Sequence, residues 1–321
     1  MGSRDRTAEL LDGIDVASAR GLELGPLTSP VVRRDAGDVR YLDHVTTEEL
    51  RARYATHEGF DVEAIVPIDY ASSGGSMRAA VGSDAPFDYV IASHVIEHVP
   101  DLIAWFHDLR GVLGDAGVVS LAVPDHRRCF DALRAPSSSA EVVAAHLAGA
   151  SVPSPRQVFD HVASAVSWHG VIAWNEEPPF AELRAVHAEH EALHGATQVS
   201  TSGDYIDVHC WVFTPSSFTR LVSTLRRLGL LPFRLERCSD TIGGEFFARL
   251  RCAAPDDATH HEEGTAMSAR GSEHAAVRAE LAAVRAERDA VRAELDRTVA
   301  SRSWRLTRPV RALNRRRPWR H

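Results

Sequence analysis

Short apolar runs of strand length alternate with helix-like patterns from Gly21 to about Cys252, and this alternation constrains the fold of the 321-residue chain more than any other feature. Such a rhythm is typical of βαβ units, in which helices connect parallel strands. The apolar runs predict seven strands, at residues 21–24, 39–42, 64–67, 89–92, 118–122, 207–213 and 246–251. We therefore expect an α/β fold with a Rossmann-like, seven-stranded and mostly parallel sheet.

The stretch at residues 127–205 is too long for a simple crossover between the fifth and sixth of these strands. Its length predicts a helical cap inserted into a domain that spans residues 1–252. No run approaches 18 apolar residues, and the N-terminus lacks an apolar signal segment, so we expect neither a membrane span nor secretion. The four cysteines are scattered without a Cys-x-x-Cys pair, which favours a reducing cytoplasm.

The composition changes after Cys252. Residues 253–272 are polar and lack apolar periodicity, which is typical of a linker. Residues 273–300 repeat the pattern Ala-Val-Arg-Ala-Glu every seven residues, which predicts a short coiled coil with a second copy or another partner helix. Arg288 interrupts the apolar seam, so a single solvated helix is the alternative.

Charge is distributed unevenly along the chain. All 36 basic residues are arginine, and eight of them lie in residues 301–321, whereas all 44 acidic residues lie within residues 1–301. The excess of acidic residues in residues 1–301 disfavours binding to nucleic acid, so we expect no nucleic-acid partner. In residues 301–321 the arginines alternate with apolar residues such as Trp304 and Trp319. This basic amphipathic tail favours an anionic membrane surface, with a solvated tail as the alternative.

Acidic residues and one glycine stand near the ends of the first three predicted strands. Glu23 and Gly25 end the first strand, where a glycine lets the backbone approach a ligand closely. Asp43 lies 18 residues beyond Gly25, and its carboxylate suits the two hydroxyls of a ribose. Asp69 could accept a hydrogen bond from an adenine amino group while Tyr70 covers the ring. The alternative for Gly25 is a plain turn.

The segment at residues 87–101, Phe-Asp-Tyr-Val-Ile-Ala-Ser-His-Val-Ile-Glu-His-Val-Pro-Asp, resembles the fourth-strand motif of class I S-adenosylmethionine-dependent methyltransferases of the type 11 group. Residues 209–218, His-Cys-Trp-Val-Phe-Thr-Pro-Ser-Ser-Phe, resemble a later element of the same group. The resemblance covers residues 21–252 and implies S-adenosylmethionine as the cofactor. It also implies that the methionine and ribose parts contact Glu23, Gly25 and Asp43, and that the adenine contacts Asp69, Tyr70 and Ser93.

One departure from that family lies in the loop after the first strand. Residues 26–28 are Pro-Leu-Thr where the family more often has glycines. A dinucleotide needs such a loop for its pyrophosphate, whereas a sulfonium cofactor has no phosphate, so the sequence favours S-adenosylmethionine over NAD. The same departure leaves a second hypothesis, a catalytically inactive scaffold that acts through its coiled coil and arginine-rich tail.

Three residues are the catalytic candidates. Methyl transfer requires the protein to align the acceptor and, for a hydroxyl, to remove its proton. His98 and His209, near the ends of the fourth and sixth predicted strands, are candidate bases, and Glu97 could orient His98 or bind the substrate. The alternative for each histidine is a hydrogen-bonded turn residue.

The run His94-Val-Ile-Glu97-His98 also allows two metal hypotheses. It fits the His-x-x-Glu-His signature of one class of zinc proteases, but Pro100 leaves at most one helical turn there, so we reject a protease. Some quinone-pathway O-methyltransferases resemble this segment with a Glu-x-x-Glu-His that holds a divalent cation. Because His94 replaces the first carboxylate, a hard cation such as Mg²⁺ is not favoured, and the sequence assigns no metal ligand.

Residues 301–309, with the pattern Ser-x-Ser-Trp-Arg-Leu-Thr-x-Pro, resemble tails of bacterial glycosyltransferases and methyltransferases of surface-glycan assembly. This resemblance implies O-methylation of a sugar in a surface polysaccharide or glycolipid precursor. We accordingly expect a cytoplasmic enzyme at the inner face of the membrane. The acceptor itself has no signature in the sequence.

Overall fold

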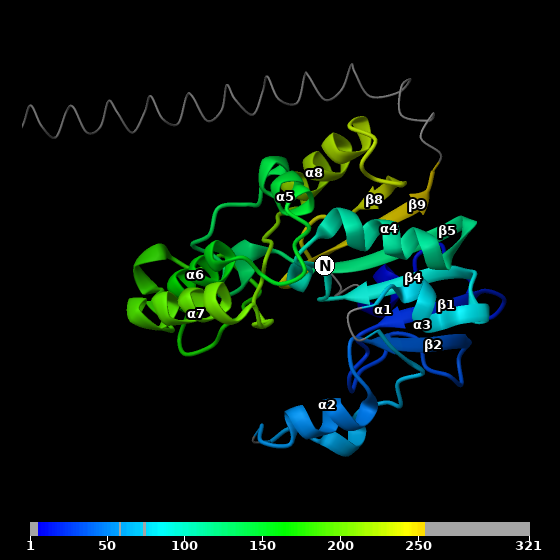
Figure 1. Ribbon diagram of the computed structural model, residues 1–321, viewed down its shortest axis with the longest axis horizontal. Coiled ribbons are helices and arrows are strands. Elements are labelled where there is room, and N and C mark those ends of the chain that lie inside the picture. Colours follow the sequence, from blue (N-terminus) through cyan, green and yellow to red (C-terminus); the bar gives the residue numbers. More distant parts are fainter. Residues whose placement is uncertain (1–5, 58, 73–74, 254–321) are drawn as a thin grey trace, which may run out of the picture. The chain divides into compact units, whose positions relative to one another are not determined.

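A computed structural model describes residues 6–57, 59–72 and 75–253. Within these ranges seven strands form one sheet in the order β3-β2-β1-β4-β5-β9-β8 (Figure 1). The strands β1 to β5 run parallel, and β9 pairs antiparallel with both β5 and β8. The expected Rossmann-like, mostly parallel sheet is confirmed. The strands of this sheet are β1 (Arg20–Leu24), β2 (Asp38–Asp43), β3 (Tyr70–Ala71), β4 (Phe87–Ser93), β5 (Leu113–Pro124), β8 (Phe233–Cys238) and β9 (Glu245–Cys252).

Helices lie between most of the strands. The α-helices are α1 (Arg6–Leu10), α2 (Thr47–Tyr54), α3 (Met77–Val81), α4 (Leu102–Val112), α5 (Ser139–Leu147), α6 (Pro155–Ser164), α7 (Glu189–Ser202) and α8 (Pro215–Arg227). Short 3₁₀ turns are η1 (Val62–Ala64), η2 (Gly82–Asp84), η3 (Ile96–His98), η4 (His126–Arg128) and η5 (Phe180–Glu182), and β6 (Val166–Ser167) pairs with β7 (Arg184–Ala185). No helix in the described ranges is long and apolar enough to cross a membrane.

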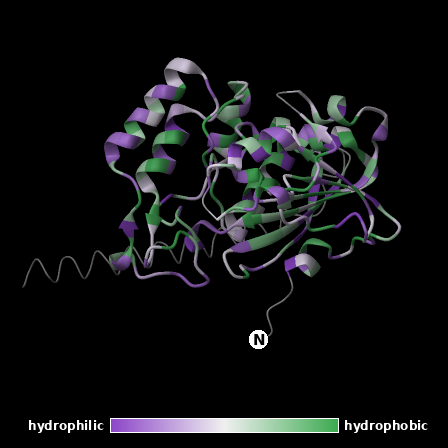
Figure 2. Cartoon of the chain, turned by 90° about the horizontal axis from the view of Figure 1, so that it is seen from below, coloured by the Kyte–Doolittle hydropathy of each residue, from purple (hydrophilic) through white to green (hydrophobic). Residues whose placement is uncertain are grey.

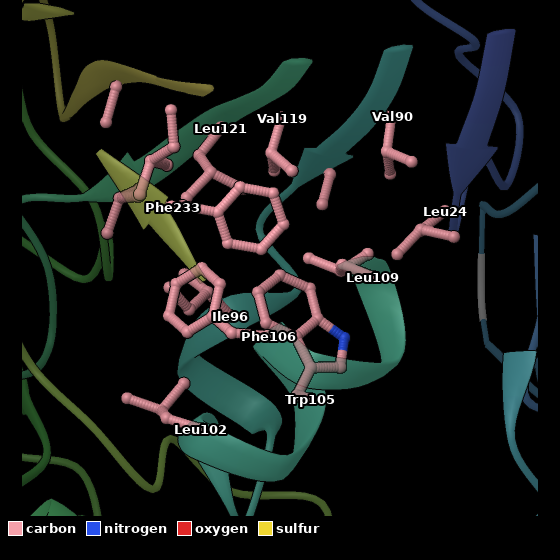
Figure 3. Packing of buried hydrophobic residues seen from close by; sticks show 14 of the residues in the cluster. Leu24, Val90, Ile96, Leu102, Trp105, Phe106, Leu109, Val119, Leu121 and Phe233 are labelled. Carbon is pink, nitrogen blue, oxygen red and sulfur yellow. The ribbon is translucent and has the colours of Figure 1, made fainter. Parts of the chain in front are cut away.

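The helix α4 shows how the sequence produces the core on one face of the sheet. Asp101 caps it by accepting a hydrogen bond from the Ala104 amide at 2.9 Å. Its apolar residues recur at helical spacing, so Phe106 and Leu109 lie on one face against the sheet residues Val90, Val119 and Leu121 (Figure 3). Each such side chain, fully buried, stabilises the fold by about 1.5–3 kcal/mol.

A second apolar cluster covers the other face of the sheet. Leu10 of α1 packs there, and its carbonyl accepts a hydrogen bond from the buried Ser120 hydroxyl at 2.6 Å. In Figure 2 hydrophobic residues dominate the central strands, whereas the helices carry hydrophilic residues as well. The N-terminal helix is therefore part of the domain core.

Residues 127–205 contain the expected helical insertion, with α5, α6 and α7 between β5 and α8. The helices α6 and α7 lie side by side (Figure 1). Their contact is close at Gly195, where an added Cβ would lie 3.0 Å from Val158 Cγ1. The predicted linker (253–272), coiled coil (273–300) and tail (301–321) lie outside the described residues, apart from Ala253.

Two strand predictions are wrong. The sequence predicts the third strand at residues 64–67, but η1 ends at Ala64, residues 65–67 form no strand, and β3 comes later, at Tyr70–Ala71. Residues 207–213 do not pair in the sheet either, although Phe213 forms an isolated bridge with Asp125. The remaining strand of the sheet is β8, an edge strand that the apolar runs did not reveal.

Candidate functional site

The order of the strands creates one edge at which a ligand can bind. The strand β1 lies between β2 and β4, so the chain leaves the carboxyl ends of β1 and β4 in opposite directions. In open α/β sheets such a switch point forms a crevice at the carboxyl ends of the strands. The last residues of β1, β2 and β4, together with the loops that follow these strands, carry most of the predicted site residues.

Gly25, directly after β1, brings two of these loops together. Its φ of +61° is a conformation that favours glycine, and its amide donates to the Leu42 carbonyl at 2.9 Å. A Cβ on Gly25 would lie 3.5 Å from Val95 Cγ2 in the loop after β4. Gly25 therefore turns the chain without a side chain at the predicted position, with the loop after β4 close beside it.

Asp43 ends β2 at the same edge, and its side chain is mostly buried. Its Oδ1 accepts a hydrogen bond from the His44 amide at 2.7 Å and lies 2.6 Å from His44 Nδ1. Among the described residues no hydrogen bond reaches Oδ2. This oxygen remains available as an acceptor for a hydroxyl group.

Glu23 has a different role from the one predicted for it. Its buried carboxylate accepts hydrogen bonds from the amides of Val31, at 2.7 Å, and Val32, at 3.1 Å. Burial outweighs these bonds and raises the pKa of Glu23 to about 6. Both carboxylate oxygens thus hold the loop between β1 and β2, and neither is left for a ligand.

Asp69 and Tyr70 do not reach the edge that carries Asp43. Asp69 precedes β3 instead of following it, and its carboxylate pairs with Arg34 and accepts from the Tyr41 amide at 2.7 Å. The Tyr70 hydroxyl donates to Asp84, whose carboxylate also lies 3.7 Å from Arg20 at the start of β1. Tyr70 therefore extends toward the amino ends of the strands, away from the predicted adenine position.

Ser93, the last residue of β4, is contacted by an arginine from the N-terminal helix. Arg6 of α1 donates to the Ser93 hydroxyl through Nη2 and to Glu245 Oε1, at 2.7 Å, through Nε. No pattern in the sequence marks Arg6, because its position near the ends of the strands depends on tertiary packing.

His94 and Glu97 follow β4 and form an ion pair. His94 has a φ of +54°, its Nδ1 lies 3.5 Å from Glu97 Oε1, and its Nε2 lies 2.8 Å from Glu245 Oε2. Burial alone would lower the pKa of His94, but the two carboxylates outweigh it and raise the pKa to about 9. The charged His94 in turn holds the pKa of Glu97 below its ordinary value, against the effect of burial.

Glu97 is only 1% exposed, and among the described residues no group donates a hydrogen bond to either of its carboxylate oxygens. Its backbone is fixed, because its carbonyl accepts from the amides of Cys210, at 2.6 Å, and Trp211, at 3.2 Å. These two bonds bring the segment that contains His209 against η3.

The two candidate histidines lie next to each other, although 111 positions separate them in the sequence. The rings of His98 and His209 meet edge to face with centroids 4.8 Å apart. His98 Nδ1 lies 2.8 Å from Asp207 Oδ1, and His209 Nδ1 lies 2.5 Å from Asp131 Oδ2. In both rings the second nitrogen, Nε2, is therefore the one open to a ligand.

Asp131 belongs to a buried network that no sequence pattern predicts. Arg134 is buried and donates through Nη1 to Asp131 Oδ1, at 2.8 Å, and to the His209 carbonyl, at 2.9 Å. Its Nε donates to Asp160 at 2.9 Å. The network fixes both the backbone and the ring of His209.

The structure thus brings together all three catalytic candidates. Glu97, His98 and His209 each offer one ligand atom, and these atoms lie within 4.8 Å of one another. We call these three residues the Glu-His-His cluster. Glu97 and His98 belong to η3, shortly after β4, so the cluster lies near the switch point that carries Gly25 and Asp43.

Comparisons with known proteins give one family. The family described as "Methyltransferase domain" matches residues 4–225. No curated protein matches the chain.

Solved structures resemble the chain only distantly. CalH, a trans-methyltransferase complexed with SAH, has 14% identity and a TM-score of 0.38 over 76% of this chain, and the match covers 54% of CalH. The CcbJ methyltransferase from Streptomyces caelestis has 13% identity and a TM-score of 0.38, with 78% of this chain and 89% of CcbJ covered. The DhpI-SAH complex has 16% identity and a TM-score of 0.37, with coverage of 76% and 83%.

Proposed function

Because the chain belongs to the family of methyltransferase domains, we propose that it transfers a methyl group from S-adenosylmethionine to a hydroxyl oxygen of a sugar. The sugar would belong to a surface polysaccharide or a glycolipid precursor. The observation that carries the cofactor assignment is the meeting of Gly25, Asp43 and the loop after β4 at the switch point. The resemblance of residues 301–309 to tails of glycan-assembly enzymes supports the acceptor class.

The residues at this edge suit an adenosyl cofactor. Asp43 Oδ2 is available to accept from a ribose hydroxyl, and the backbone at Gly25 has no side chain to keep the cofactor away. Ser93 supplies a hydroxyl at the end of β4. The bound cofactor supplies an electrophilic methyl group on a positively charged sulfur.

The Glu-His-His cluster suits an acceptor with a hydroxyl group. We assign the role of general base to His209, because Asp131 fixes its Nδ1 and leaves Nε2 to take the proton. The Asp131 carboxylate stabilises the imidazolium that forms. His98 and Glu97 line the same space and would contact the acceptor.

An inactive scaffold is not favoured by these observations. A scaffold without catalytic activity would need neither an Asp43 oxygen without a partner nor three candidate catalytic side chains held close together. The predicted coiled coil and tail remain part of the proposal as attachments to a partner helix and to an anionic membrane surface.

The cofactor assignment is tested by titration calorimetry with S-adenosylhomocysteine. We expect Asp43→Ala to weaken binding by about tenfold or more, since it removes a charge-assisted acceptor. Asp38→Ala is the matched control, because Asp38 starts the same strand and pairs with Arg40 at 2.8 Å. Equal affinity in wild type and Asp43→Ala would refute the ribose contact, and no binding by wild type would refute the proposed cofactor.

The acceptor class is tested with radiolabelled cofactor and a panel of nucleotide-activated sugars and lipid-linked oligosaccharides. Label in an alkali-stable ether on a sugar is the expected product. His209→Ala should lower the rate of transfer by about 10²–10⁴-fold while leaving S-adenosylhomocysteine binding intact. Transfer to a nitrogen or carbon acceptor alone would contradict the proposal.

A further inference from the structure

The Glu-His-His cluster combines features that direct base catalysis does not require. Its members come from η3 and from the segment before α8, and their ligand atoms lie within 4.8 Å of one another. Glu97 is fully buried, and His98 and His209 are at most partly exposed. Two imidazoles and one carboxylate that converge in this way form a common set of ligands for a metal ion.

The carboxylate partners of the two histidines point to the same conclusion. Asp207 binds His98 at Nδ1, and Asp131 binds His209 at Nδ1. Histidines that bind metals almost always donate their other ring N–H to a carboxylate, a carbonyl or water, which orients the ring and raises its basicity. One such pair is common in proteins, but here both histidines have such a partner and offer a ligand atom within 4.8 Å of one buried carboxylate.

Glu97 provides the independent observation. Both of its carboxylate oxygens are buried without a hydrogen-bond donor among the described residues. A buried polar group without a partner is costly, and a charged one more so. His94 pairs with one of these oxygens only at the limit of hydrogen-bond distance, with its Nδ1 3.5 Å from Oε1, and its Nε2 is held by Glu245. Oε2 has no partner among the described residues, and a bound cation would supply one.

We propose that Glu97, His98 and His209 bind one divalent first-row transition-metal ion. Imidazole ligands suit Zn²⁺, Fe²⁺, Co²⁺ and Ni²⁺, whereas Mg²⁺ and Ca²⁺ prefer oxygen ligands. In a tetrahedral site, ligand atoms about 2.1 Å from the ion lie about 3.4 Å from one another. The ligand atoms of the three residues, now within 4.8 Å of one another, would therefore move slightly closer together when the ion binds. The set includes His209 in place of His94, which the sequence pattern alone had paired with Glu97 and His98.

This inference rests on the proposed function and deepens it. Three protein ligands leave coordination positions open for the acceptor oxygen, and a bound ion lowers the pKa of that hydroxyl. The hydroxyl proton passes to solvent water, the oxygen forms a bond to the methyl carbon, and the carbon–sulfur electron pair stays on sulfur. With an ion bound, His209 is a ligand, and the ion activates the hydroxyl in its place.

The test uses the full chain, stripped of metal with a chelator and titrated with Co²⁺ alone while visible absorption is recorded. We expect one Co²⁺ per chain, with ligand-field bands that Zn²⁺ abolishes. Glu97→Gln and His209→Ala should each weaken binding by more than about 100-fold, and Asp207→Asn, which removes an orienting partner, by about 10- to 100-fold. His146→Gln is the matched control, because His146 also pairs with a carboxylate, Asp101 at 3.0 Å, but lies outside the cluster.

Several results would overturn the proposal. The first is the absence of Co²⁺ bands at millimolar metal. The second is equal Co²⁺ affinity in wild type and Glu97→Gln. The third is an equal loss of Co²⁺ affinity in His146→Gln and His209→Ala. If a variant fails to fold by circular dichroism, the wild type decides alone: a metal site requires Zn²⁺ or Co²⁺, but not Mg²⁺, to raise its melting temperature. Binding of S-adenosylhomocysteine to the stripped chain is measured in parallel, so a failed metal site and a failed cofactor site give different results.

Discussion

The ring of Tyr89 in β4 occupies the space beside Gly21, its direct partner in β1. A Cβ on Gly21 would fall 2.1 Å from Tyr89 Cζ, so the two strands next to the switch point can pair in this way only with glycine in β1. We expect Gly21→Ala to lower the free energy of unfolding by about 1–3 kcal/mol in urea denaturation, because the buried ring must move. Gly75→Ala is the control, since a Cβ there meets no atom within 4 Å. Equal stability of the two variants would show that the ring relocates without cost.

Five strands of the sheet follow from the sequence because each carries a mostly apolar run that is largely buried. Residues 207–213 form a similar run and are largely buried, but their backbone bonds go to loops: the Cys210 amide donates to Glu97, and the Val212 amide to the Ser137 hydroxyl. An apolar run indicates that a segment is buried, but it does not indicate which groups the backbone of that segment hydrogen-bonds with. The strand β8 pairs in the sheet but is not an apolar run, so its sequence did not predict it. It lies at the edge of the sheet, where charged residues such as Glu236 and Arg237 are tolerated.

The candidate site was predicted in part. Gly25, Asp43, Glu97 and His98 could be found because each lies at the end of a strand or shortly after it, where the topology of the sheet fixes its place. Asp131, which lies 78 positions from His209, carries no local signal. Its role depends on how the inserted helices fold back, which the sequence pattern does not encode.

Removal of Arg134 should destabilise the domain strongly. Arg134 and Asp131 are both almost fully buried and pair at 2.8 Å, so Arg134→Ala removes the arginine charge from a buried carboxylate and leaves His209 as its partner. We expect a loss of about 3–5 kcal/mol in the free energy of unfolding, measured by urea denaturation. The control is Arg110→Ala, which breaks the exposed pair of Arg110 with Asp115 and should cost about 0–1 kcal/mol. Similar losses in both variants would mean that solvent reaches Asp131.

The tail at residues 301–321, outside the described residues, should direct the protein to anionic membranes. Its eight arginines have no acidic residue near them in the sequence. We expect the full chain to float with vesicles that contain phosphatidylglycerol, and a chain that ends at residue 300 to remain in solution. Binding should weaken with added salt, because screening acts on exposed charges. Flotation of the shortened chain with the same vesicles would assign membrane binding to another surface.

Glu23 should make stability depend on pH in a direction opposite to that of most carboxylates. Its pKa in the folded chain is about 6, above the ordinary 4.5, so the folded state holds the proton more tightly than the unfolded state. Stability from this group is therefore fully present below pH 4.5 and is lost as the pH rises through 6. Glu23→Gln cannot titrate and should be less stable at every pH, because one amide loses its acceptor.

The measurement is the difference in unfolding free energy between wild type and Glu23→Gln, taken by urea denaturation from pH 4 to pH 7. This difference should shrink by about 2 kcal/mol as the pH rises, since one pKa unit corresponds to about 1.4 kcal/mol. Glu49→Gln is the control of opposite sign, because the Thr46 amide holds the pKa of Glu49 below its ordinary value. A difference that stays constant for Glu23 across this range would show that its carboxyl group is hydrated in the folded chain.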